Sequence, residues 1–119
     1  MKPLLLSSMA ACLLGVLNVS QAADLEAGRE AFQKFACASC HGDDAKTSTM
    51  PEYPVLAGQY ADYLRHALTA YKRGQEGAPA SANIRKNAVM GPMASQLSAT
   101  DIENIAAWLA SLPSPLSVR

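Results

Sequence analysis

The 119-residue sequence lacks an excess of charge of either sign and has few aromatic side chains. Ten Lys and Arg residues balance ten Asp and Glu residues, so bulk charge provides no basic surface for nucleic acid or anionic lipid. Aromatic residues make up 6% of the chain, which is little for the core of the single domain that this length allows. A partner must therefore be recognised by a local patch of surface.

Cysteine and histidine are also scarce. The chain has three cysteines and two histidines, and only Cys12 and His66 lie outside the motif Cys37-Ala38-Ser39-Cys40-His41. A structural zinc site needs four such ligands, but Cys12 lies in a segment expected to be removed and His66 lies off the apolar stripe of its helix. A thioredoxin-type pair needs a strand entering the motif, whereas the downstream residues are typical of helix and loop.

The motif itself is typical of covalent haem attachment. Positions three and four apart share one face of a helical turn, so both thiols and the imidazole can converge on one ring. We expect Cys37 and Cys40 to form thioethers with haem c, and His41 to bind its iron. One buried porphyrin would also supply the apolar volume that the aromatic residues do not. A simple dithiol or disulfide is the remaining alternative.

Residues 1–22 have the pattern of a cleaved signal peptide. Lys2 precedes an apolar run over residues 4–19, and small residues suitable for cleavage end at Ala22. A retained anchor is disfavoured because the run is shorter than the roughly 20 residues that span a bilayer. Lipidation at Cys12 is disfavoured because the chain stays apolar after it. We expect a periplasmic domain over residues 23–119, with no stable membrane insertion after cleavage. Export supports the haem interpretation, because covalent haem attachment takes place outside the bacterial cytoplasm.

The remaining pattern predicts an all-α fold, with helices over residues 24–36, 59–73 and 98–112. Gly28 interrupts the first helix, and a mid-helix glycine is about 1 kcal/mol less favourable than alanine, so it indicates close packing against another element. Ser98 and Asp101 form a capping box at the start of the last helix.

The second helix is expected to stop at Gly74. Its three tyrosines are expected to pack in the core or the haem pocket: Tyr60, Tyr63 and Tyr71. His66 is expected to be a solvated surface residue and a poor second ligand to iron.

The long segment over residues 74–92 ends in Met90-Gly91-Pro92-Met93, which provides two thioether ligands. Loops of this length are usually functional, and a methionine sulfur is a soft, neutral ligand that suits haem iron. Pro92 disfavours helix at Gly91, so we expect Met90 on extended chain and Met93 at the start of a short turn. Met90 is the favoured axial ligand, Met93 is the fallback, and an open or water-ligated iron is the third possibility.

These features, together with Pro54-Val55-Leu56-Ala57-Gly58 and the helix opening at Leu97-Ser98, resemble the class I c-type cytochromes. The chain is similar to one domain of the small bacterial periplasmic cytochromes that carry one or two haems. The resemblance covers residues 24–112, and it implies the small cytochrome c fold with one haem for the one motif present.

The resemblance also implies roles for particular residues. The Pro54 carbonyl would accept a hydrogen bond from His41, which fixes the orientation of a ligating imidazole. Met90 matches the position of the ligand methionine. The first and last helices would cross in close contact, through Gly28, Phe32 and Trp108.

The function expected from this reasoning is one-electron transfer in the periplasm by a protein that is not an enzyme. With both axial positions filled by protein, no position is open for substrate. The expected partners are redox proteins, namely a dehydrogenase, a reductase complex or a terminal oxidase, and the chain itself is expected to be a monomer or weak dimer. The alternatives are an electron-relay subunit of a dehydrogenase or oxidase complex and a gas-binding haem sensor.

Overall fold

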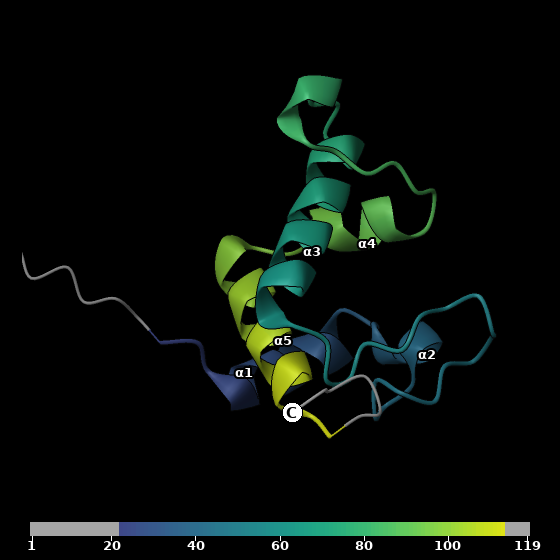
Figure 1. Cartoon of the computed structure of the whole chain (residues 1–119), viewed down its shortest axis with the longest axis vertical. Helices are drawn as coiled ribbons and strands as arrows, with labels where there is room; N and C mark the ends of the chain where they lie inside the picture. Colours follow the sequence, from purple (N-terminus) through teal and green to yellow (C-terminus); the bar gives the residue numbers. More distant parts are fainter. Residues whose placement is uncertain (1–21, 114–119) are drawn as a thin grey trace, which may run out of the picture.

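The computed structural model describes residues 22–113, and this part of the chain is helical without strands (Figure 1). The elements are α1 (Leu25–Lys34), α2 (Ala38–His41), α3 (Ala61–Gln75), the 3-10 turn η1 (Ala80–Ala82), α4 (Met90–Ser95) and α5 (Ala99–Ser111). The predicted all-α fold is confirmed. The predicted signal peptide lies outside the described residues apart from Ala22, and none of the helices within residues 22–113 is long and apolar enough to cross a membrane.

Helices α1 and α5 cross in close contact, as Figure 1 shows. A Cβ atom added at Gly28 would lie 2.1 Å from the carbonyl oxygen of Asn104 and 2.8 Å from the Cβ atom of Trp108. Next to this contact the rings of Phe32 and Trp108 pack with their centroids 5.0 Å apart, tilted by 52°. The expected role of Gly28 is confirmed, because no larger residue fits at this crossing without a shift of the backbone.

Helix α5 begins with the predicted capping box. The Ser98 Oγ atom accepts a hydrogen bond from the Asp101 backbone N–H at 3.1 Å, and the Asp101 carboxylate accepts one from the Ser98 N–H at 2.9 Å. Both bonds satisfy donors that the helix cannot pair internally. The helix then buries Ile102, Ile105, Ala106, Trp108 and Leu109, and this face holds the core on which the functional site rests.

Helix α3 does not end at Gly74, so that expectation is wrong. The helix continues to Gln75, and Gly77 takes the positive φ of +78° that follows the last turn. A Cβ atom at Gly74 would lie 2.1 Å from the carbonyl oxygen of Arg85, and the Arg85 N–H donates to the carbonyl of Ala70 at 3.0 Å. Gly74 therefore provides room for a returning segment, which its position near a helix end did not reveal.

The expected extended conformation at Met90 is also wrong, because α4 begins at this residue and not at Met93. Pro92 is the third residue of the helix, where a backbone N–H has no partner inside the helix, so proline is tolerated there. The Asn87 side chain accepts hydrogen bonds from the N–H groups of Val89 and Met90, each at 2.9 Å. This side-chain cap starts the helix three residues earlier than expected.

Candidate functional site

The motif forms a single helical turn. His41 N–H donates to the carbonyl of Cys37 at 3.0 Å, and α2 spans only Ala38–His41. Ala36 has a positive φ of 57°, which turns the chain between α1 and α2. Cys37 and Cys40 are both free thiols and partly buried, and burial raises the pKa of the Cys37 thiol. Both sulfur atoms are therefore available for thioether formation next to the imidazole.

His41 is buried, with 6% of its surface exposed, and its Nδ1 atom lies 3.0 Å from the carbonyl oxygen of Pro54. A carbonyl oxygen only accepts hydrogen bonds, so this contact places the imidazole proton on Nδ1. The Nε2 atom then keeps its lone pair, which is the state in which histidine binds a metal. The structure thus brings together the two residues that the sequence separates by the loop over residues 42–53.

Backbone hydrogen bonds hold that loop against the motif. The carbonyl of Ala45, which is fully buried, accepts from the N–H groups of Leu56 and Ala57 at 2.9 and 3.0 Å. Asp44 accepts hydrogen bonds from the Thr47 N–H, the Thr47 hydroxyl and the Lys46 N–H. These bonds lower the pKa of Asp44 to about 2, so the carboxylate stays charged and keeps the turn after His41 closed at ordinary pH.

A cavity of about 500 Å³ lies beside the motif. Cys37, Cys40 and His41 line one part of it, and Met90 and Met93 of α4 line another. The rest of the wall is mainly apolar and includes Phe32, Leu56, Leu64, Leu68, Ile105 and Leu109. The volume lies in the range of about 300–1,000 Å³ typical of pockets for small molecules and cofactors. Thiols, an imidazole, thioethers and an apolar wall fit a flat macrocycle that carries iron.

The two methionines of α4 differ in their surroundings. Both are partly buried, but the Met93 sulfur lies 3.9 Å from the Gln96 Nε2 atom, which donates to it. Met50 is 42% exposed and does not line the cavity. The sequence-based preference for Met90 over Met93 stays a prediction, and the contact with Gln96 agrees with a packing role for Met93.

Sequence reasoning missed Arg85, which among residues 22–113 is the only lysine or arginine that lines the cavity. Its guanidinium carbon lies 5.5 Å from the ring centre of Tyr63 and 5.6 Å from that of Tyr71, and hydrogen bonds with both tyrosines raise its pKa. None of the ion pairs within residues 22–113 involves it. Arg85 comes from a segment without hydrophobic periodicity, so the pattern around it gives no indication of where its side chain lies. The signal that could have indicated a cation there is the pair Tyr63 and Tyr71 on α3.

Of the other residues considered from the sequence, two line the cavity and two do not. Tyr60 is 71% exposed and is the residue before α3, so the expectation that it packs in the core is wrong. His66 is exposed, as expected. Tyr63 and Tyr71 line the cavity in agreement with the prediction of pocket packing.

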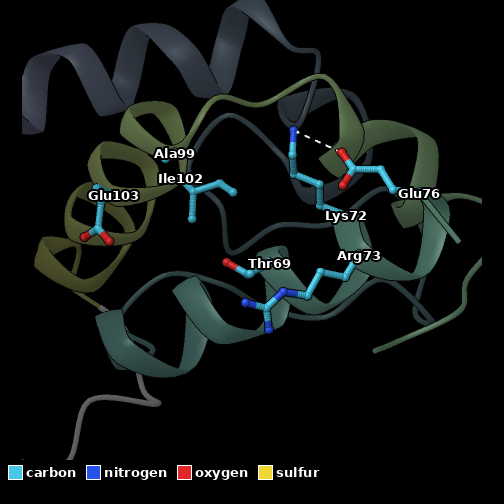
Figure 2. Close-up of a pocket in the computed structure, with 7 residues that line it drawn as sticks. All are labelled: Thr69, Lys72, Arg73, Glu76, Ala99, Ile102 and Glu103. Atoms are coloured by element: carbon cyan, nitrogen blue, oxygen red, sulfur yellow. Dashed lines mark ion pairs between the residues drawn. The ribbon is translucent and has the colours of Figure 1, made fainter. Parts of the chain in front are cut away.

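A smaller hollow of about 280 Å³ lies between α3 and α5 and has a different character (Figure 2). Its walls are Thr69, Lys72, Arg73, Glu76, Ala99, Ile102 and Glu103. They contain no thiol, imidazole or thioether, so this hollow lacks the ligands that a haem needs.

Crossed terminal helices and a Cys-x-x-Cys-His turn that faces an apolar cavity define a c-type cytochrome. The family model for cytochrome c matches residues 25–113, and the chain belongs to this family. Its homologues are electron-transfer proteins and not enzymes, in agreement with the expectation from the sequence.

Two curated relatives and one solved structure illustrate the similarity. Cytochrome c-554(548) of Halomonas halodenitrificans is 41% identical over 91 residues, which are 76% of this chain and 98% of that protein. The thiosulfate dehydrogenase electron acceptor of Stutzerimonas stutzeri is 36% identical over 81 residues, which are 68% of this chain and 33% of that protein. Reduced recombinant cytochrome c4 from Pseudomonas stutzeri superposes with a TM-score of 0.66 at 40% identity, over 77% of this chain and 47% of that chain. This chain therefore spans less than half of the thiosulfate dehydrogenase electron acceptor and of cytochrome c4, and nearly all of cytochrome c-554(548).

Proposed function

We propose that this chain is a periplasmic one-electron carrier with one haem c, attached through Cys37 and Cys40 and ligated by His41 and Met90. The observation that supports this most is the buried His41 imidazole, whose Nδ1 atom faces the Pro54 carbonyl at 3.0 Å. Its Nε2 atom is left as a metal donor beside a cavity that both cysteines and Met90 line.

In this proposal the chain's own residues bind, orient and shield the cofactor. Haem, when bound, supplies the one-electron couple of its iron. Pro54 fixes the tautomer of His41 and makes it a better donor, and Met90 supplies a soft sulfur that raises the potential relative to harder ligands. The apolar wall would exclude water, and Arg85 would supply a positive charge beside the cofactor.

We propose redox proteins as partners, and among them a dehydrogenase that delivers electrons to this chain. The support comes from the relative named as a thiosulfate dehydrogenase electron acceptor. A chain that works as a fixed subunit of such a complex would co-purify with it, whereas a free carrier is isolated alone. The same proposal includes export through the peptide at residues 1–22 and a domain over residues 23–119. It also includes a monomeric or weakly dimeric state.

The experiment is the mass and visible spectrum of protein purified from a periplasmic fraction. We expect the mass of residues 23–119 plus one haem that remains attached after denaturation, and sharp c-type bands on reduction. Slow binding of carbon monoxide to the ferrous protein would agree with two protein ligands. Haem that dissociates on denaturation would contradict attachment through the cysteines, and fast carbon monoxide binding would favour a gas-binding protein.

A further inference from the structure

Helix α4 is too short to be stable by itself. It has only six residues, Met90–Ser95, and helices of fewer than about twelve residues are marginal by themselves. Its position must therefore come from contacts with other elements. Figure 1 shows α4 beside α3, and the two helices are in contact.

The most direct of these contacts is made by Lys72 of α3. Its Nζ atom donates to the carbonyl of Ser95 at 3.1 Å and to the carbonyl of Leu97 at 2.8 Å. Ser95 is the last residue of α4 and Leu97 lies two residues beyond it. The last backbone acceptors of a helix have no partner in it, and a cation is favourable there. The Lys72 ammonium group therefore serves as a C-terminal cap supplied by another helix.

The surroundings strengthen this cap. Glu76 lies 3.5 Å from the Lys72 ammonium group, as the dashed line in Figure 2 marks, and the Lys72 side chain is only 29% exposed. Partial burial makes charge-assisted hydrogen bonds stronger than they are in water. At the other end of α4, the second residue, Gly91, is buried against Gln75, where an added Cβ atom would lie 2.7 Å from the Gln75 side-chain oxygen.

We propose that Lys72 is a positioning residue that holds α4 in the orientation in which the Met90 sulfur reaches the haem iron. This inference rests on the proposed function, in which Met90 is the axial ligand. Met90 and Ser95 are the first and last residues of one helix about 9 Å long. A helix released at Ser95 is free to tilt, and the tilt moves the Met90 sulfur away from the cavity.

The test uses the haem-loaded ferric protein and imidazole as an external ligand. Imidazole binds only the fraction of molecules in which the methionine is off the iron, so its apparent affinity reports that fraction. Since hydrogen bonds to charged groups are the stronger ones, we expect Lys72→Met to tighten imidazole binding about tenfold. Lys72→Arg keeps the charge and the donors and should stay close to wild type. Lys46→Met removes the same charge from an exposed position and should leave the affinity unchanged.

A second readout separates positioning from general stability. In urea, Lys72→Met should lose the far-red band of ferric methionine ligation at a much lower urea concentration than that at which Trp108 fluorescence reports unfolding. The difference between these two urea midpoints should be smaller in wild type. Should Lys72→Met fail to fold, Lys72→Gln keeps a neutral donor and should give a smaller shift in the same direction. Wild-type imidazole affinity in both variants, or an equal shift of both urea midpoints, would overturn the role of Lys72.

The ligand assignment is checked independently with Met90→Ala. Loss of the far-red band in Met90→Ala supports Met90 as the ligand, independently of the results with the Lys72 variants. A far-red band that persists in Met90→Ala would overturn Met90 as the proposed ligand. If Met90→Ala loses the band but Lys72→Met binds imidazole with wild-type affinity, only the inference about Lys72 is overturned.

Discussion

At the scale of single residues, Arg85 is the charged group whose surroundings most directly concern the cofactor. It lines the cavity, contacts two tyrosine rings and takes part in none of the ion pairs within residues 22–113. The stacking of a guanidinium group on aromatic rings holds it in place without neutralising it. Arg85 therefore keeps a positive charge next to the site where an electron arrives.

Replacing Arg85 with glutamine should lower the reduction potential, because the positive charge favours the form with the added electron. At an effective dielectric constant of about 20, a unit charge roughly 10 Å away is worth about 1.7 kcal/mol. Solvent screening of this exposed side chain reduces the expected shift to about 20–50 mV. Spectroelectrochemical titration of the purified protein measures it.

Two further variants provide the controls for this prediction. Arg85→Lys keeps the charge and should retain most of the potential. Lys86→Gln removes a neighbouring charge that does not line the cavity and should change the potential less. Equal shifts in Arg85→Gln and Lys86→Gln would contradict a specific role for Arg85.

At the scale of secondary-structure elements, the crossing of α1 and α5 determines where the motif lies. The motif follows α1 directly, and α5 supplies Ile105 and Leu109 to the wall of the cavity. The two helices approach so closely at Gly28 that the Asn104 carbonyl occupies the space of a side chain. The geometry of the cavity therefore depends on a glycine that does not line it.

Gly28→Ala should destabilise the protein although alanine is the better helix former. The helix-propensity gain is about 1 kcal/mol, but the added Cβ atom would lie 2.1 Å from a backbone oxygen, and overpacking of this kind usually costs about 1–3 kcal/mol or more. We expect a net loss of about 1–2 kcal/mol in the free energy of unfolding, measured by urea denaturation of the haem-loaded protein.

The exposed position Glu30 on the same helix provides a control. Glu30→Ala should leave the free energy of unfolding within about 0.5 kcal/mol of wild type. An increase in stability for Gly28→Ala would show that α1 and α5 separate easily, and it would contradict the close crossing.

At the scale of the whole molecule, the cavity is large relative to the core that surrounds it. In the part of the chain that the structure describes, only Phe32 and Leu109 are large side chains that are fully buried, and the cavity measures about 500 Å³. Protein interiors are otherwise close-packed, so a chain with this volume left unfilled loses many contacts. The bound cofactor is then a large part of the core, and folding and haem attachment are linked.

The double variant Cys37→Ala/Cys40→Ala should therefore lose cooperative unfolding as well as covalent haem. We expect retained helical signal in the far-ultraviolet, a much weaker near-ultraviolet signal from Trp108, and a broad thermal transition. Cys37→Ala alone keeps one thiol and should retain part of the haem with an intermediate midpoint. A cooperative transition near the wild-type midpoint in the double variant would show that the protein folds without its cofactor.

Features that depend on neighbours within a few residues could be predicted before the structure was known. The haem motif needs only one helical turn, and the capping box at Ser98 and Asp101 needs only four residues, so both could be predicted from spacing. The crossing at Gly28 could be predicted because glycine is unfavourable inside a helix, so its presence there indicates close packing against another element. The partner residue Trp108 came from the family resemblance.

The tertiary structure alone decided the features that depend on segments distant in sequence. Gly74 lies inside α3 because Arg85 returns across it, and the same return places the Arg85 side chain between Tyr63 and Tyr71. Lys72 meets the end of α4 more than twenty residues later in the chain. Local spacing carries no information about such contacts, because they form only when separate helices pack. The sequence therefore specifies the Cys-x-x-Cys-His turn, and the packing of α3 against α4 decides which side chains line another part of the cavity.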